Sequence, residues 1–252
     1  ASCDLLVIGS GAGGLSAAVT AAHLGLSVVV VEKAPVFGGT TAWSGGWLWV
    51  PRNPLAVAAG LTEDEAGPRE YLRGIVGAAA DGPRMRAFLA HGPAMVQFHL
   101  DHTALRFIDG NAIPDFHGRV AGARTGGRSV CAAPFDASVL GPRLKALRPP
   151  LDVGSFLGMS IGGDLRHFLR ANRALDSAWY VAKRITRHAL EVLRHGQGTH
   201  RFAGNALIAA LMKSALDRGV ELFAGQTVLR LTKDGTRVTG AVLATANGEH
   251  EI

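Results

Sequence analysis

Cysteine is scarce in this sequence: Cys3 and Cys131 are the only two in 252 residues. Two thiols so far apart in the chain do not make the disulfide framework of a secreted protein, so a reducing cytoplasm is the expected location. We expect both cysteines to be small buried side chains rather than nucleophiles. No arrangement of ligand residues points to a metal, and no metal site is predicted.

An uninterrupted apolar run long enough to cross a membrane is also absent. Residues 5–31 carry no charge apart from His23, but the glycine-rich stretch at 9–14 breaks the segment. No basic leader or cleavage site precedes it, so the sequence predicts neither a signal peptide nor a spanning helix. Membrane association is therefore not expected.

Acidic residues are fewer than basic ones, 20 against 26, which gives a net charge of +6. The excess is concentrated between Gly163 and Arg201. No recognition motif or aromatic platform accompanies it, so nucleic acid binding is not expected. Two solvated helix faces are the favoured interpretation; a docking face for a partner or a missing domain, and an anionic membrane surface, are the alternatives. The basic residues of this segment are Arg166, Arg170, Arg173, Lys183, Arg184, Arg187, Arg194 and Arg201.

Glycine, by contrast, is abundant, and its placement near the start of the chain is the most informative motif. Gly9, Gly11 and Gly14 lie between a short apolar run at 4–9 and an alanine-rich stretch of helical period at 13–25. A second apolar run follows at 27–31. This order predicts a strand, a tight turn, a helix and a second strand.

Each glycine of this turn has a predicted task. Gly9 permits the turn, Gly11 lets the backbone approach a diphosphate, and Gly14 lets the helix pack closely on the strand. The phosphates would accept hydrogen bonds from backbone N–H groups at the positive end of the helix. The other members of the segment are Ser10, Ala12 and Gly13.

Glu32 ends the second apolar run. A carboxylate at this point is placed to accept hydrogen bonds from the ribose hydroxyls of an adenosine. Its charge would repel a 2′-phosphate, so NADP is not expected.

The stretch after Glu32 favours FAD over NAD. An NAD-binding unit continues into another helix, whereas residues 35–54 contain three prolines and three tryptophans among glycines and cannot form one regular helix. The chain must cross the cofactor as a loop. Hydroxyl groups suit phosphate and flavin atoms, and glycines allow close approach to a flat ring. The candidate residues are Gly38, Gly39, Thr40, Thr41, Ser44, Gly45 and Gly46.

Several segments resemble the flavoprotein family of fumarate reductase, succinate dehydrogenase and 3-ketosteroid Δ1-dehydrogenase, with spacing closest to the ketosteroid branch. The resemblance rests on Glu32-Lys33, residues 38–46 and Trp49-Val50-Pro51, and downstream on 147–150, 194–199 and 204–207. It implies a cofactor role for Lys33 and contact of the adenine with backbone groups at Val228. Some members bind flavin covalently through a histidine of the loop at 38–46; no histidine lies between His23 and His91, so noncovalent FAD is expected.

The expected fold is α/β: a Rossmann-like FAD-binding domain of the glutathione-reductase type, built from residues 1–50 and 199–252, with a mostly helical insertion at 51–198. Residues 205–218 are predicted to form a helix and 220–223 a strand. Asp234-Gly235 and Asn247-Gly248 are hairpin dipeptides, so 227–252 should be a meander of three strands. The family pattern continues beyond this point with a capping domain, so we expect a fragment of a longer protein.

The resemblance implies an oxidoreductase that acts on a small molecule, at a carbon–carbon bond beside a carbonyl or carboxylate. Both dehydrogenation and the reverse reduction are open, and a flavin-binding subunit or fragment without activity of its own is the alternative. The ketosteroid branch tends to have tyrosines after an aspartate near Asp115, where this chain reads Asp115-Phe116-His117. Phe116 cannot ionise, which leaves His117 as the candidate proton-transfer group. Tyr71 and Tyr180 are expected to be packing residues.

Overall fold

The computed structural model describes residues 2–152, 155–162, 164–245 and 248–252. The chain forms two compact units, one of residues Ala1–Gly46 with Pro134–Ile252 and the other of Trp47–Ala133. Each unit is defined by making most of its contacts within itself. The expectation that residues 51–198 are inserted into an FAD-binding core concerns the family's organisation and stays a prediction.

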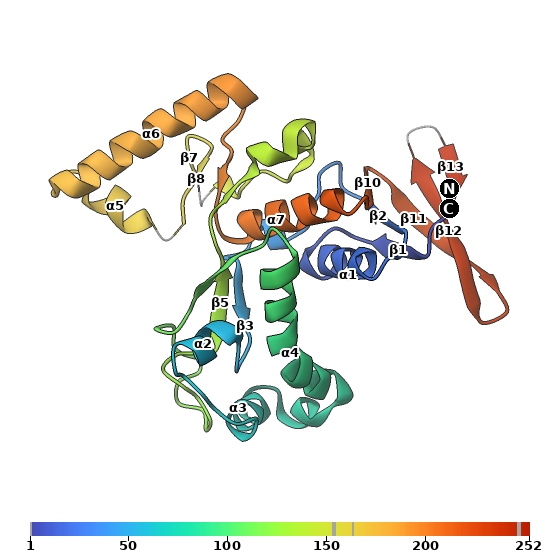
Figure 1. Ribbon diagram of the computed structural model, residues 1–252, viewed down its shortest axis with the longest axis horizontal. Coiled ribbons are helices and arrows are strands. Elements are labelled where there is room, and N and C mark those ends of the chain that lie inside the picture. The colour runs from blue at the N-terminus through green and yellow to red at the C-terminus, as the bar shows by residue number, and fades with distance from the viewer. Residues whose placement is uncertain (1, 153–154, 163, 246–247) are drawn as a thin grey trace. The chain divides into compact units, whose positions relative to one another are not determined.

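The first unit contains a parallel sheet in the order β1–β2–β10 (Figure 1). The four valines of β2 are all buried, as expected of a central strand in a parallel sheet. The strand–turn–helix–strand order predicted for residues 4–32 is confirmed. The elements are β1 (Leu5–Ile8), α1 (Ala12–His23), β2 (Val28–Glu32) and β10 (Glu221–Ala224).

Helix α7 (Ala203–Asp217) forms the centre of this unit. Eleven of its fifteen residues are buried, and it packs against α1 and the 3₁₀ turn η1 (Thr41–Trp43). A helix that is apolar on nearly all sides requires neighbours on nearly all sides. The helix predicted at 205–218 is confirmed, with its start two residues earlier.

A three-stranded antiparallel meander follows β10 in the chain, in the order β11–β12–β13. Its hairpin at Asp234-Gly235 is confirmed, and Gly235 has a φ of +57°. Asn247 of the second hairpin dipeptide lies outside the described residues. Ala241 and Leu243 pack with Val29 and Val31 of the parallel sheet. The strands are β11 (Thr227–Asp234), β12 (Arg237–Thr245) and β13 (Gly248–Glu251).

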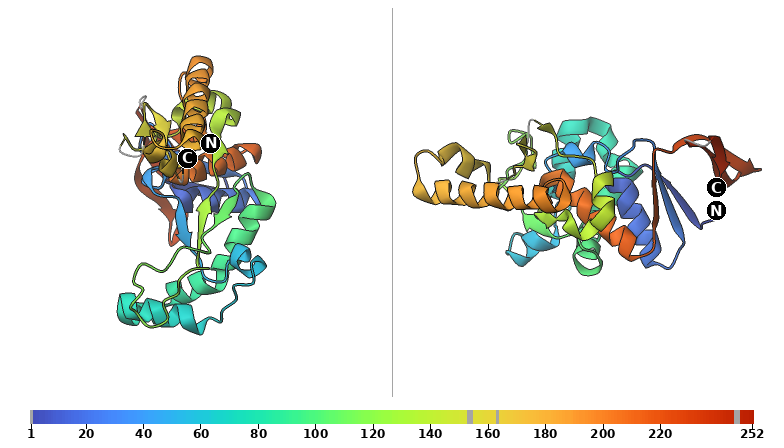
Figure 2. Two further views of the ribbon diagram at one scale, coloured as in Figure 1. Left: turned by 90° about the vertical axis from the view of Figure 1, so that its left-hand side faces the viewer. Right: turned by 90° about the horizontal axis from the view of Figure 1, so that it is seen from above.

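The rest of the first unit is dominated by the long helix α6 (Leu175–His195), which α5 (Leu165–Arg170) contacts. Figures 1 and 2 show α5 beside one end of α6. Helix α6 ends at Gly196, whose φ of +75° is the left-handed conformation common after helices. The shorter elements are β6 (Phe135–Asp136), η3 (Ala137–Ala146), β7 (Ser155–Phe156), β8 (Met159–Ser160) and β9 (His200–Arg201).

The second unit joins a small antiparallel sheet, in the order β3–β5–β4, to three α-helices. Its longest helix, α4, contains Pro93. The elements are β3 (Trp47–Trp49), α2 (Pro54–Ala58), α3 (Ala66–Val76), η2 (Gly77–Asp81), α4 (Pro83–His102), β4 (Phe107–Asp109) and β5 (Ser129–Ala132).

Cys3 and Cys131 are not joined by a disulfide; Cys131 is buried, as expected, whereas Cys3 is only half-buried. Burial raises the pKa of Cys131 to about 11. A thiol with so high a pKa is a poor nucleophile, as expected. Within the described part of the chain, no helix combines the length and hydropathy needed to span a membrane. Nor do the described residues include a group of three or more His, Cys, Asp or Glu side chains suited to a metal ion.

Candidate functional site

The turn between β1 and α1 is closely packed. The N–H of Gly9 donates to the carbonyl of Val31 at 2.8 Å, and Gly9 has a φ of +99°, which favours glycine. A Cβ at Gly14 would lie 2.1 Å from the carbonyl oxygen of Gly9. Only glycine at position 14 therefore allows α1 to pack this tightly against the end of β1.

The N-terminus of α1 presents backbone donors with no carboxylate nearby in sequence. Gly11 is the N-cap and has no side chain with which to cap the helix, whose first turn holds no acidic residue. The N–H of Ala12 donates to Oγ1 of Thr41 at 3.2 Å, whereas helical geometry leaves the N–H groups of Gly13 and Gly14 without an acceptor in the helix. Together with the helix dipole, these donors suit a phosphate group.

Glu32 is held at the end of β2 by three hydrogen bonds. Its Oε2 accepts from the N–H of Ser10 at 3.0 Å and from the Ser10 hydroxyl at 2.6 Å, and its Oε1 accepts from the N–H of Ala34 at 2.9 Å. Burial alone would raise the pKa of Glu32, but the hydrogen bonds from Ser10 and Ala34 and the charge of Arg148 outweigh it and lower the pKa. The carboxylate is thus ionised near neutral pH, and Oε1 keeps a lone pair for a further donor.

Two glycines of the loop at 38–46 are required by packing. A Cβ at Gly38 would lie 2.9 Å from Cβ of Ala42 and 3.1 Å from Cγ2 of Ile208 in α7. A Cβ at Gly46 would lie 2.4 Å from the carbonyl carbon of Ala203. These glycines, expected from sequence to admit a flat ring, let the loop lie against α7.

The hydroxyl groups of the loop organise it internally. Ser44 Oγ donates to the carbonyl of Thr41 at 2.8 Å and accepts from the N–H of Gly46 at 3.2 Å. The Ser44 carbonyl accepts from the N–H of Gly204 at 3.0 Å, which fixes the loop to the first turn of α7. Gly45 is exposed next to Ser44. The backbone of the loop at Gly45, between Ser44 and Gly46, is therefore accessible to a ligand.

A cavity of about 230 Å³ opens beside this loop, and its wall includes Asn205, which the sequence contained only as part of the matching segment 204–207. The Nδ2 of Asn205 donates to the carbonyl of Arg148 at 2.7 Å, while its buried Oδ1 has no partner among the described residues. A buried acceptor without a partner is costly, so it marks a place where a donor on a ligand or water would be stabilised. The wall includes Trp43, Ser44, Gly45, Pro150, Ile161 and Phe202.

Arg148 is a cation close to the candidate nucleotide site. Its guanidinium carbon lies 4.6 Å from the ring centroid of Trp43, and its charge helps to lower the pKa of Glu32. Its buried Nε has no hydrogen-bond partner in the described part of the chain. In the sequence, Arg148 appeared only within the matching segment 147–150. A cation far along the chain from a phosphate-binding turn has no local sequence signature that assigns it to the site.

The remaining candidate cofactor-binding residues are Lys33, Gly39, Thr40 and Val228. Lys33 and Thr40 are exposed beside Glu32 and Gly39, and Val228 is half-buried on β11, where it packs against the cluster formed with Val29 and Val31. Gly39 faces Gly11 across the site: a Cβ on it would lie 3.8 Å from the Gly11 Cα. The structure thus gathers the segments 9–14, 32–33 and 38–46 around the N-terminus of α1.

His117 belongs to the second compact unit. Its side chain is exposed, and its backbone N–H donates to Oη of Tyr71 at 3.2 Å. Phe116 beside it is 93% exposed. Tyr71 is buried, as expected of a packing residue, and Tyr180 in the first unit hydrogen-bonds to Asp164 and stacks on His167.

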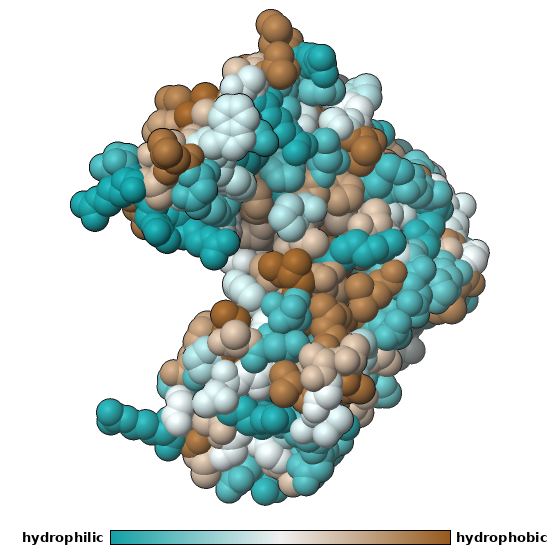
Figure 3. All heavy atoms as spheres, turned by 60° about the vertical axis from the view of Figure 1, so that its left-hand side comes forward, coloured by the Kyte–Doolittle hydropathy of each residue, from teal (hydrophilic) through white to brown (hydrophobic). Residues whose placement is uncertain are grey.

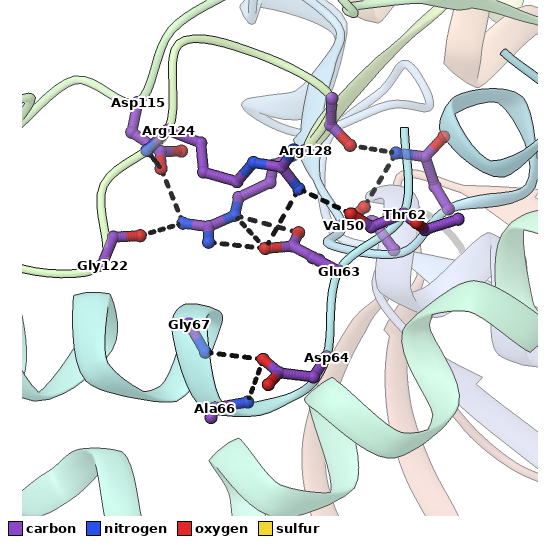
Figure 4. A network of polar contacts seen from close by, with 12 residues as sticks. Val50, Thr62, Glu63, Asp64, Ala66, Gly67, Asp115, Gly122, Arg124 and Arg128 are labelled. Atoms are coloured by element: carbon purple, nitrogen blue, oxygen red, sulfur yellow. Dashed lines mark hydrogen bonds and ion pairs between the residues drawn. The ribbon is translucent and has the colours of Figure 1, made fainter. Parts of the chain in front are cut away.

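The loop that carries Phe116 and His117 is anchored by the buried Arg128 (Figure 4). The Nη1 of Arg128 donates to Asp115 at 2.7 Å, and its Nη2 donates to Glu63 at 2.6 Å. The guanidinium also lies near two rings, 5.9 Å from the centroid of Trp49 and 5.8 Å from that of Tyr71. This network fixes the position of Asp115 and thereby the chain on either side of it.

A glycine turn at a helix N-terminus, followed by an ionised carboxylate at the end of the second parallel strand, defines a dinucleotide-binding protein. The model of the FAD binding domain family matches residues 4–252. The chain therefore belongs to this family, and its cofactor is FAD. Residues Gly14 and Glu32 fit that cofactor, since the first gives the close turn and the second an ordered carboxylate.

Dehydrogenases are among the relatives of this chain. It is 38% identical over 251 residues to the 4-oxocyclohex-2-ene-1-carboxylate 5-dehydrogenase of Sinomonas cyclohexanicum, a match that covers 98% of this chain and 42% of that protein. It is 44% identical over 147 residues to a 3-oxosteroid 1-dehydrogenase of Mycolicibacterium smegmatis, covering 58% of this chain and 26% of that protein. The chain thus spans less than half the length of these relatives, and the resemblance noted in the sequence is confirmed.

Solved structures agree on the fold. The 3-ketosteroid Δ1-dehydrogenase of Sterolibacterium denitrificans matches with a TM-score of 0.85 and 31% identity over 99% of this chain and 45% of that one. A flavocytochrome c3 fumarate reductase matches at 17% identity with a TM-score of 0.54 over 99% of this chain and 32% of that one, which supports the fold alone. The α/β FAD-binding fold expected from the sequence is confirmed.

Proposed function

We propose that this chain is the FAD-binding part of an oxidoreductase that dehydrogenates a carbon–carbon bond beside a ring ketone. The observation that carries the proposal is the match along 98% of the chain to a dehydrogenase whose name specifies an oxo group on a six-membered ring. The 3-oxosteroid 1-dehydrogenases share that combination of a ring ketone with a dehydrogenation. FAD, when bound, supplies the acceptor for a hydride.

The residues of the first unit would hold the cofactor along its length. The segment Gly9–Gly14 at the N-terminus of α1 takes the diphosphate, and Glu32 takes the adenosine ribose. Lys33 would contribute to the cofactor site, and the backbone at Val228 would contact the adenine. The loop of Gly38, Gly39, Thr40, Thr41, Ser44, Gly45 and Gly46 faces the flavin.

Proton removal from the carbon beside the ketone needs a base in addition to the cofactor. His117 is the candidate in this chain, and its exposure leaves the imidazole open to a substrate. Arg128 and Asp115 act on it indirectly, because they hold the loop in place. Phe116 cannot transfer a proton and would contribute an apolar contact to the substrate.

The proposal is tested by turnover. The chain loaded with FAD is mixed with 4-oxocyclohex-2-ene-1-carboxylate or a 3-oxosteroid and an artificial electron acceptor, and the rise of product absorption is followed. Turnover of either ring ketone, abolished when FAD is omitted, is the expected result. Retained FAD without turnover would contradict the assigned activity for this chain and leave it as a flavin-binding part.

Glutamine in place of Glu32 should weaken FAD binding about tenfold, because charge-assisted hydrogen bonds are worth about 1.5 kcal/mol. Quenching of flavin fluorescence on binding gives the dissociation constant. Glu221→Gln, an exposed change on the neighbouring strand β10, is the matched control and should bind FAD as the unaltered chain does. Equal affinity of all three proteins would remove Glu32 from the cofactor site.

FAD should be released entirely by acid. The loop at 38–46 contains no histidine to form a covalent bond to the flavin. After precipitation of the yellow protein with trichloroacetic acid, all flavin absorption is expected in the supernatant. A yellow pellet that survives washing would show a covalent link.

A further inference from the structure

Helix α6 is amphipathic, but it presents its apolar side to solvent. Its buried residues are Ser177, Arg184 and Glu191, all polar. On the opposite side Leu175 is 91% exposed, Trp179 64% and Leu193 82%. An ordinary surface helix buries its apolar face against the core. The orientation of α6 is therefore the reverse of the usual one.

Specific polar contacts hold α6 in this orientation. The Nε of Arg184 lies 3.2 Å from Oδ2 of Asp164, and its Nη2 donates to the carbonyl of Ser160 at 3.0 Å. Glu191 accepts from the backbone N–H groups of Thr199 at 2.8 Å and His200 at 3.1 Å. Turning the helix over would leave these buried charges without partners, at a large cost.

The elements that precede α6 in the chain also expose large apolar side chains. The face of α6 and its neighbours α5 and the β7–β8 hairpin share a set of large, solvent-exposed apolar side chains, which we call the outer apolar face. Figure 3, which brings this side of the molecule forward, shows apolar side chains among hydrophilic ones at the surface. The members are Phe156, Leu157, Leu165, Leu169, Leu175, Trp179, Ile185, Leu190, Val192 and Leu193.

The charge around this face decides between possible occupants. Exposed basic side chains lie on the same elements: Arg166, Arg170 and Arg173 on and after α5, and Lys183, Arg187 and Arg194 on α6, of which Arg187 is paired with Asp136 and Glu191. A second copy of the chain would bring an equally positive surface against it, which is unfavourable. Anionic lipid headgroups would instead attract these cations while the leucines enter the acyl boundary.

The placement of Trp179 agrees with a lipid surface. The Nζ of Lys183 lies 5.0 Å from the centroid of the Trp179 ring, so an indole and an ammonium group share the edge of the apolar face. Tryptophan and lysine together are typical of the membrane–water interface. Since no described helix is suited to span a bilayer, α6 would lie in the plane of the surface.

We propose that the outer apolar face of α5 and α6 docks on an anionic lipid membrane. The proposal takes up an alternative that the sequence left open, an anionic membrane surface, whereas solvated basic faces were the favoured interpretation. Periodicity identified the two sides of α6, but only the contacts of Arg184 and Glu191 show which side is turned inward.

Co-sedimentation with vesicles tests the proposal. The chain is mixed with vesicles of phosphatidylcholine alone or with a quarter of phosphatidylglycerol, at low and high salt. We expect binding to the anionic vesicles that weakens with salt, and at least a tenfold loss of it in the double variant Leu175→Glu/Leu193→Glu. The control Leu24→Glu/Val57→Glu adds the same charge at two exposed apolar residues elsewhere and should bind as the unaltered chain does.

Circular dichroism and FAD retention establish that both double variants are folded. Sedimentation that is absent with anionic vesicles, or equal for the two double variants, would overturn the proposal. Light scattering then identifies the other occupant: a dimer of the unaltered chain that Leu175→Glu/Leu193→Glu converts to a monomer would assign the face to a second copy.

Discussion

Alanine in place of Gly14 is expected to weaken FAD binding at least a hundredfold and to destabilise the first unit by about 3 kcal/mol, the upper range for overpacking. The added Cβ would lie 2.1 Å from the carbonyl oxygen of Gly9 and 3.3 Å from Cγ1 of Val7. Relief requires α1 to move away from β1. That movement displaces the backbone donors at the N-terminus of α1 on which a diphosphate depends.

Gly13→Ala is the matched control for stability. A Cβ at Gly13 meets nothing within 4 Å, and a glycine-to-alanine change in a helix stabilises by about 0.5–1 kcal/mol. Urea denaturation should therefore separate the two variants in opposite directions from the unaltered chain. Equal stability of the Gly14 and Gly13 variants would show that the close packing of α1 on the turn is not required.

Methionine in place of Arg128 is expected to lower the free energy of unfolding by about 3–5 kcal/mol, the cost of leaving buried charges without their partner. The side chains of Arg128 and Asp115 are both 2% exposed, and that of Glu63 is 9% exposed. Methionine fills much of the volume but supplies none of the hydrogen bonds. Urea denaturation of the folded chain measures the difference.

Two further variants distinguish the cost of leaving charges buried without a partner from the cost of removing an arginine as such. Arg73→Met breaks the exposed pair with Asp81, 2.8 Å apart, and should cost far less than Arg128→Met, because water screens an exposed ion pair. Adding Asp115→Asn and Glu63→Gln to Arg128→Met removes the orphaned charges and should restore part of the stability. A cost for Arg128→Met no larger than that for Arg73→Met would contradict the account of this network.

The dinucleotide unit was predictable because its determinants are local. The turn glycines, the helix and Glu32 lie within the first 32 residues, and the hydrogen bonds that hold Glu32 come from Ser10 and Ala34, within or next to that span. The roles of Gly38 and Gly46 were not predictable in the same way, because the atoms that a Cβ would meet there include those of Ile208 and Ala203, far along the chain.

The buried polar residues show the same limit. Arg128 reads as an ordinary cation until Glu63, 65 residues earlier, is seen to contact it. The Oδ1 of Asn205 is buried without a partner among the described residues, on a helix that packs against η1 in the loop at 38–46. Long-range packing, which no periodicity encodes, determines which polar side chains are buried.

The central claim is that this chain forms an FAD site from the turn at 9–14, Glu32 and the loop at 38–46. The most direct measurement is a visible absorption spectrum of the purified chain after incubation with excess FAD and removal of free cofactor. Retained flavin bands in one-to-one ratio with protein are the predicted result. A folded but colourless protein would contradict the claim that these residues suffice to hold the cofactor.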